Sequence, residues 1–319
     1  MQLSSPLLRR PGAVPADAPD LGVAAHYGDP YREQRSLVAG TAGVDLSHRP
    51  VVRVSGPDRL RWLHSLTSQH LETLAPGVAT EALVLSPHGH VEHHLPLVDD
   101  GEAVWAHVEP GTAEALVGYL DSMRFWSAVR VEVMPSYAVV LRPDPVPGVP
   151  SRATADGVES FVAREDLEQV LLRELAGVWA LEALRIAAGR PRAGRETDHR
   201  TIPHEVGWIG PAVHLDKGCY RGQETVARVH NLGRPPRRLV LLHLDGSDST
   251  LPGHGDPVVL GDRAVGVVTS SARHYELGPI ALAVVKRSTP VDTDLVAGGV
   301  PATQEVVVPA TPDAVPSGG

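Results

Sequence analysis

Short apolar runs and helical repeats alternate through the first half of the chain. Three valines around one arginine predict a strand over 51–54, a Ser-Gly-Pro-Asp turn follows, and leucines every three residues predict a helix over 60–66. Thr112 can cap a second helix. Alternation of apolar and polar positions predicts further strands over 82–85, 91–98, 103–108, 129–133 and 137–141. Strands interleaved with helices in this way indicate an α+β region.

The last third of the chain shows a different pattern, with short apolar runs separated only by turn residues. This pattern is typical of a small β-barrel. We expect the barrel over residues 237–308, with strands at 239–244, 257–260, 264–270, 280–286, 295–296 and 304–308.

The segments between these patterns are assigned by composition. We expect a flexible N-terminus over 1–25 and a disordered tail over 309–319. The α+β region then covers 26–236 as two lobes, with a Pro-, Gly- and Ala-rich connection near 142–160. Helices are predicted over 165–175 and 178–188. Residues 190–220 lack periodicity, and irregular stretches of this length inside compact domains are usually functional or disordered.

Composition narrows the classes of protein to which the chain can belong. A chain of 319 residues is longer than a single ordinary hydrophobic core supports, which suggests two or three domains. A composition of 42% hydrophobic and 21% charged residues fits a globular protein. A net charge of −9 argues against broad nucleic-acid binding, which needs a basic face. The single cysteine cannot form an internal disulfide, and no secretory or membrane-spanning run is present. We therefore expect a cytoplasmic protein without membrane association. We also expect a monomer.

The most distinctive stretch is Asp-Lys-Gly-Cys-Tyr-Arg-Gly-Gln-Glu at 216–224. It holds the only cysteine, Cys219, and one of only two lysines, Lys217. In an arginine-rich chain, a retained lysine suggests a place where a compact ammonium is needed. Glycines at 218 and 222 indicate a loop, and a thiol between Lys217 and Arg221 lies in electropositive surroundings that favour a reactive thiolate. The alternative is that Cys219 is a small buried apolar residue.

Lys217–Glu224 resembles the signature of the YgfZ family of folate-binding proteins, relatives of the glycine-cleavage aminomethyltransferase, the T-protein. The similarity continues through Arg185–Gly189 and Asp198–Glu205 upstream, and through Val226–Arg228 and Arg237–Leu239 downstream. Weaker similarity covers about 27–309.

The resemblance implies a T-protein-like folate-binding region of two related lobes followed by a C-terminal β-barrel. It implies tetrahydrofolate or a one-carbon derivative as cofactor. It also implies a role in the assembly or repair of iron–sulfur client proteins, including enzymes that modify tRNA. Cys219 would be the reactive group and Lys217 would favour its thiolate. The residues expected to contact or position folate are Gly218, Tyr220, Gly222, Gln223, Glu224, Arg185, Trp208 and Arg228.

Two departures from the T-protein pattern leave other functions open. The hairpin pattern that carries two aspartates in the T-protein ends here in His93 and His94, and Ala187 stands at the position of its pterin-holding glutamate. A true aminomethyltransferase or folate-dependent demethylase is therefore the alternative, and a folate-binding scaffold without chemistry is a third reading. Alternating His88, His90, Glu92 and His94 could present ligands to zinc. No second ligand pair stands at a defined spacing elsewhere in the sequence, so a solvated hairpin face is the favoured reading and we expect no metal.

Overall fold

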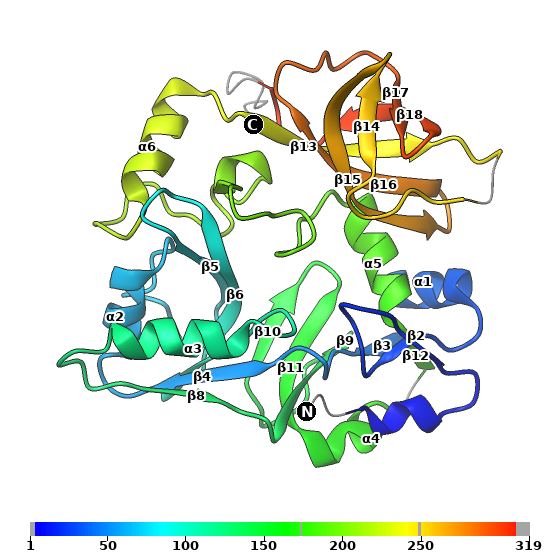
Figure 1. Ribbon diagram of the computed structural model, residues 1–319. Helices are drawn as coiled ribbons and strands as arrows, with labels where there is room; N and C mark the ends of the chain where they lie inside the picture. Colours follow the sequence, from blue (N-terminus) through cyan, green and yellow to red (C-terminus); the bar gives the residue numbers. More distant parts are fainter. Residues whose placement is uncertain (1–3, 173, 248–249, 311–319) are drawn as a thin grey trace, which may run out of the picture. The chain divides into compact units, whose positions relative to one another are not determined.

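The computed structural model describes residues 4–172, 174–247 and 250–310 (Figure 1). The chain forms two compact units that interleave in sequence. Unit 1 comprises residues 1–84, 93–181 and 216–220, and unit 2 comprises residues 85–92, 182–215 and 221–319. Helix α5 (Val178–Ala187) runs across one boundary, as the helical pattern over 178–188 predicts.

The first sheet of unit 1 has the strand order β5-β6-β7-β4-β8. Its apolar face packs against two helices, because Trp62 and Leu63 of the first and Leu116 and Leu120 of the second share one core with the strand residues. Buried leucines at helical spacing thus decide which helix faces turn inward. The elements are β4 (Val51–Ser55), α2 (Arg59–Leu66), β5 (Ala79–Leu85), β6 (Val91–Asp99), β7 (Ala103–His107), α3 (Ala113–Ser122) and β8 (Arg130–Val133).

The second sheet of unit 1 has the order β10-β11-β9-β3-β12, in which β12 is parallel to β3. The ring centroid of Trp105 on β7 lies 4.9 Å from that of Tyr137 and 6.0 Å from that of Phe161, so the two sheets meet through an aromatic contact. The elements are β3 (Ala42–Asp45), β9 (Tyr137–Arg142), β10 (Ser151–Thr154), β11 (Gly157–Ala163) and β12 (Glu174–Ala176), with α1 (Pro30–Val38), η2 (Arg164–Asp166) and α4 (Leu167–Val170).

Three predictions for unit 1 are wrong. The expected flexible segment at 1–25 contains η1 (Pro6–Arg9), β1 (Val14–Pro15) and β2 (Ala24–His26), and Leu7 is fully buried in the core of the second sheet. The expected connection near 142–160 contains the hairpin β10–β11. Its strand pattern is obscured because Arg152 and Glu159 are charged and yet buried. The expected helix over 165–175 ends at Val170, because 174–176 pair with β3.

Unit 2 contains the predicted barrel, which is closed and has the strand order β13-β16-β15-β14-β17-β18. Alternate side chains of β13 divide between two cores: Val240 and Leu242 point into the barrel, while Leu239 and Leu241 pack outside it with Ile186 of α5. The strands are β13 (Arg237–Leu244), β14 (Pro257–Leu260), β15 (Arg263–His274), β16 (Gly278–Lys286), β17 (Leu295–Ala297) and β18 (Val300–Val306). Most of the expected disordered tail, residues 311–319, lies outside the described residues.

The stretch 190–220 is irregular, as predicted, with one short 3-10 helix, η3 (Pro203–Glu205). It leads to α6 (Gln223–Leu232), a helix that the sequence analysis did not predict. Among the described residues, no helix is long and apolar enough to cross a membrane.

Candidate functional site

The 216–224 segment divides between the two units after Tyr220. Residues 216–220 pack with unit 1, whereas Arg221 and α6 pack with unit 2. Each half is therefore described with the unit to which it belongs.

Lys217 is buried at the C-terminal end of α2 in unit 1. Its Nζ donates hydrogen bonds to the backbone oxygen of His64 and, at 2.5 Å, to that of Thr67, and it lies 4.8 Å from the centroid of the Tyr220 ring. Burial lowers the pKa of Lys217 to about 8. Because the last carbonyls of a helix lack partners within it, an ammonium here caps α2 and neutralises the negative end of its dipole. The two backbone oxygens converge on one point, which suits a compact ammonium. The sequence analysis instead expected the positive charge of Lys217 to favour the Cys219 thiolate.

Cys219 and Gly218 form the exposed part of this loop. A Cβ added to Gly218 would meet no heavy atom within 4 Å, so the loop has open space on that side. Tyr220 is buried behind them, and burial raises its pKa to about 12, which keeps the phenol protonated. The thiol is therefore accessible and is not the small buried residue of the alternative reading. Its reactivity stays a prediction.

In unit 2, Gly222 and Gly89 bring the N-terminal end of α6 against the turn between β5 and β6. Gly222 has a φ of 82°, and a Cβ there would lie 2.5 Å from the backbone oxygen of Ser86. A Cβ on Gly89 would lie 2.8 Å from Thr225 Cβ. Only glycine fits at either position, so the role of Gly222 in shaping this loop has a steric reason.

The other expected residues of this half lie along α6. Gln223 is the first residue of the helix, and Glu224 and Arg228 are exposed one turn apart. Arg221 forms an ion pair with Glu92, with 3.0 Å between Nη1 and Oε2. Whether Gln223, Glu224 and Arg228 contact folate stays a prediction.

Arg185 has a different place from the one expected. Its Nε and Nη2 donate to the carboxylate of Glu182, its Nη1 donates to Glu196 Oε2 at 2.9 Å and to the backbone oxygen of Arg190, and its Nη2 also donates to Ser270 Oγ. All five N–H groups of the guanidinium are thereby used. The prediction that Arg185 holds folate is wrong, because this buried side chain has no donor left for a ligand.

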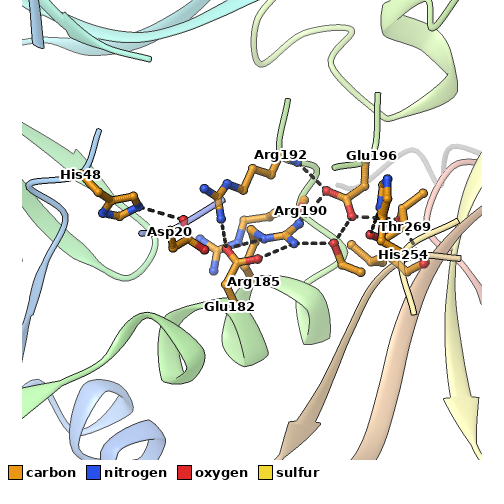
Figure 2. Close-up of polar contacts among 11 residues, drawn as sticks. Asp20, His48, Glu182, Arg185, Arg190, Arg192, Glu196, His254 and Thr269 are labelled. Atoms are coloured by element: carbon orange, nitrogen blue, oxygen red, sulfur yellow. Dashed lines mark hydrogen bonds and ion pairs between the residues drawn. The ribbon is translucent and has the colours of Figure 1, made fainter. Parts of the chain in front are cut away.

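The surroundings of Arg185 form a buried polar network in unit 2 (Figure 2). Glu196 also accepts hydrogen bonds from the backbone N–H of Arg192 and from the hydroxyls of Thr269 and Ser270 on β15. The network joins α5, the start of the irregular stretch and the barrel. Sequence analysis missed Glu196, although a glutamate in a Gly- and Arg-rich loop is a signal for a structural ion pair.

Trp208 lies in the same irregular stretch and is only 3% exposed. Its backbone N–H donates to the backbone oxygen of Pro203, and its own oxygen accepts from Ala212. The indole is thus part of the packing of the 203–212 segment. Stacking of Trp208 on a ligand stays a prediction.

The histidines of the hairpin do not gather into a metal site. Within the described ranges, no group of three or more His, Cys, Asp or Glu side chains could hold a metal ion. His94 Nε2 instead lies 2.9 Å from Oε2 of Glu81 on β5. Sequence analysis missed Glu81, although one carboxylate in an otherwise apolar strand is an available signal.

Comparison with known proteins agrees with this architecture. Residues 237–311 match the glycine cleavage T-protein C-terminal barrel domain. A crystal structure of the glycine cleavage system aminomethyltransferase T from Bartonella henselae superposes with a TM-score of 0.81 over 96% of both chains at 18% identity, which confirms the T-protein-like fold.

Relatives in sequence cover most of the chain. A chloroplastic protein of Arabidopsis thaliana, named as a transferase, is 27% identical over 288 residues, and the match spans 76% of this chain and 65% of that protein's length. An aminomethyltransferase from Streptomyces avermitilis is 27% identical over 330 residues, 88% of this chain and 87% of the relative. The aminomethyltransferase from Rubrobacter xylanophilus is 30% identical over 301 residues, 81% of this chain and 80% of the relative. The chain therefore belongs to the aminomethyltransferase family.

Proposed function

We propose that the chain binds tetrahydrofolate or a one-carbon derivative, and that the ligand lies against the 217–220 loop. The observation that carries the proposal is an exposed Cys219 beside open space at Gly218, in a chain of the aminomethyltransferase family. Lys217 and Tyr220 anchor the loop beneath these two residues, so the thiol is presented on a fixed support.

Folate binding is tested by titration calorimetry with tetrahydrofolate and its one-carbon derivatives. A micromolar dissociation constant corresponds to about 8 kcal/mol. Gly218→Leu fills the open space and should abolish or greatly weaken binding. Gly118→Leu is the matched control, because Gly118 on α3 also has no heavy atom within 4 Å of an added Cβ. No heat and no thermal stabilisation with any form would overturn the proposal.

We further propose that the folate-bound protein supports the assembly or repair of iron–sulfur enzymes, including those that modify tRNA. This part is supported by the resemblance of Lys217–Glu224 to the YgfZ signature, and Cys219 would be its reactive group. Cells that lack the protein should lose iron–sulfur enzyme activity. The wild-type chain should restore that activity, and Cys219→Ala should not. Full restoration by Cys219→Ala would favour a scaffold without thiol chemistry.

Folate-dependent aminomethyl transfer or demethylation is the second candidate. It is favoured by the relatives, which are named aminomethyltransferases, and by Glu81, which places a carboxylate 2.9 Å from His94. The substitutions at His93, His94 and Ala187 argue against it, because positive charge developing on a folate nitrogen needs a directly placed anion. Loss of a positioned acid–base group typically costs about a hundredfold or more in rate.

The two candidates are separated by one assay. The protein is combined with aminomethylated carrier protein and tetrahydrofolate, and formation of methylenetetrahydrofolate is followed. We expect no significant turnover. A rate comparable to that of a T-protein would assign the chain to the transferases.

A further inference from the structure

Arg238, the second residue of β13, is fully buried in unit 2. Because side chains alternate along a strand, it shares the face of Val240 and Leu242, which point into the barrel. Its Nη2 donates to the backbone oxygen of Thr289 at 3.1 Å and to Oε1 of Gln304 at 3.0 Å. The guanidinium is therefore enclosed at the end of the barrel where β13 begins.

The connection between β16 and β17 lies against the guanidinium at this end. Gln304 follows Ala302 by two residues on β18 and shares its barrel-facing side. Its Nε2 donates to the backbone oxygens of Pro290 at 2.8 Å and Thr293 at 3.1 Å. Thr289, the residue that accepts from Arg238, is itself buried. Hydrogen bonds thus fix the segment that covers the site.

Three buried hydrogen-bond donors at this end have no partner among the residues that the structure describes. They are Nε and Nη1 of Arg238 and the hydroxyl of Thr289. The acceptors beside them, Thr289 O and Gln304 Oε1, already accept from Nη2. Buried polar groups in folded proteins are nearly always satisfied, so this set of donors calls for an acceptor. A water molecule would bring two further hydrogens that need acceptors themselves, whereas an anion only accepts.

The charge of Arg238 gives an independent argument for an anion. Three other arginines in the described ranges are as buried as this one or nearly so, and each forms an ion pair with a glutamate. The pairs are Arg152–Glu159, Arg185–Glu196 and Arg192–Glu182. Arg238 forms no ion pair with any described acidic residue. A guanidinium cannot lose its proton in a protein, and a charge removed from water is costly unless it is paired. A water molecule would leave that charge uncompensated.

We propose that the barrel of unit 2 binds one chloride ion beside Arg238 and Thr289. Complete burial of the guanidinium favours a monatomic anion over a carboxylate or phosphate, which would occupy more of the barrel interior. The ion accepts hydrogen bonds from the unpartnered donors and supplies the negative charge that glutamates supply to the other buried arginines. Because the site exists only when the barrel is closed, chloride stabilises the folded state. The inference does not depend on folate binding.

The ion can be located directly with bromide, a heavier halide. Crystals of the full chain are grown in sodium bromide without chloride, and anomalous differences are measured at the bromine absorption edge. We expect a peak within hydrogen-bonding distance of Arg238 Nε or Nη1, and none beside Arg185, whose donors are all used. A water molecule in that position, or the absence of a peak beside Arg238, would overturn the inference.

Thermal unfolding tests the same site in solution. Above its dissociation constant, chloride should raise the Tm by roughly 3 °C for each tenfold increase in concentration, relative to sodium gluconate at equal ionic strength. Arg238→Met should have the same Tm in both salts. Thr289→Val retains the guanidinium and should need more chloride for the same rise. The exposed Arg228→Met is the matched control and should behave as wild type.

Two outcomes of the salt comparison contradict the inference. One is a wild-type Tm that is equal in chloride and gluconate. The other is a chloride dependence that Arg238→Met retains, because the ion would then bind elsewhere. If Arg238→Met does not fold, Thr289→Val and the wild-type crystals in bromide still decide the question.

Discussion

Replacing Gly222 with alanine should destabilise the protein much more than replacing Gly218, four residues away. Gly222 has a φ of 82°, a conformation that costs an alanine roughly 1–2 kcal/mol. The new Cβ would also lie 2.5 Å from the backbone oxygen of Ser86 and 2.9 Å from Gly89 Cα, which are backbone atoms that cannot rotate away. Moving the turn costs a similar amount again, so the total is about 3 kcal/mol.

Gly218→Ala is the matched control. Its Cβ would meet no heavy atom within 4 Å, and its backbone is outside the left-handed region. By the usual relation for larger domains, about 3 kcal/mol corresponds to a fall in Tm of roughly 6 °C or more. Thermal unfolding followed by circular dichroism should therefore separate Gly222→Ala from both wild type and Gly218→Ala.

The steric argument has a clear contrary result. Equal Tm values for the two alanine variants would mean that the turn around Ser86 and Gly89 yields without cost. Gly222 would then have no structural reason to be a glycine, and its place in the motif would need a ligand to explain it.

Three further predictions follow from the charged and reactive groups. Arg185→Met removes the buried guanidinium that pairs with both Glu182 and Glu196 in the interior of unit 2 and should cost about 3–5 kcal/mol by thermal or urea unfolding. The exposed Arg228→Met should stay within about 0.5 kcal/mol, and equal losses would contradict the network's importance. Burial lowers the pKa of Lys217 from 10.5 to about 8, so the free-energy cost of burying its ammonium is fully present below pH 8. The stability of wild type relative to Lys217→Met should therefore rise with pH between about 8 and 10.5. A stability difference that does not change over this pH range would refute the burial effect. Exposed Cys219 should react with iodoacetamide in the native protein at a rate comparable to that of the urea-unfolded chain, and strong protection would show that the thiol is covered.

The barrel and the first sheet could be predicted from local pattern alone. Their strands alternate apolar and polar side chains, and turn residues separate one strand from the next. These strands can therefore be recognised from the sequence without knowing which strands pair with them. The fold class followed from the same pattern together with the family resemblance of the 217–224 motif. That motif also pointed to an irregular, accessible cysteine loop.

Local pattern failed where a segment's structure depends on a distant partner. Residues 174–176 form a strand because β3, more than a hundred residues earlier, offers a parallel edge. Charged Arg152 and Glu159 hid a strand because their burial is compensated by each other and by His107. Leu7 is ordered because the second sheet provides an apolar core for it.

The sequence by itself determined the kinds of element, the barrel and the chemistry available at Lys217 and Cys219, because composition, periodicity and motif are local properties. Only the tertiary structure decided which charges meet. It directed Lys217 to the end of α2, gave every donor of Arg185 to a buried network, and placed Glu81 against His94. Hydrogen bonds and ion pairs need donor and acceptor within about 3 Å, and sequence separation carries no information about that distance.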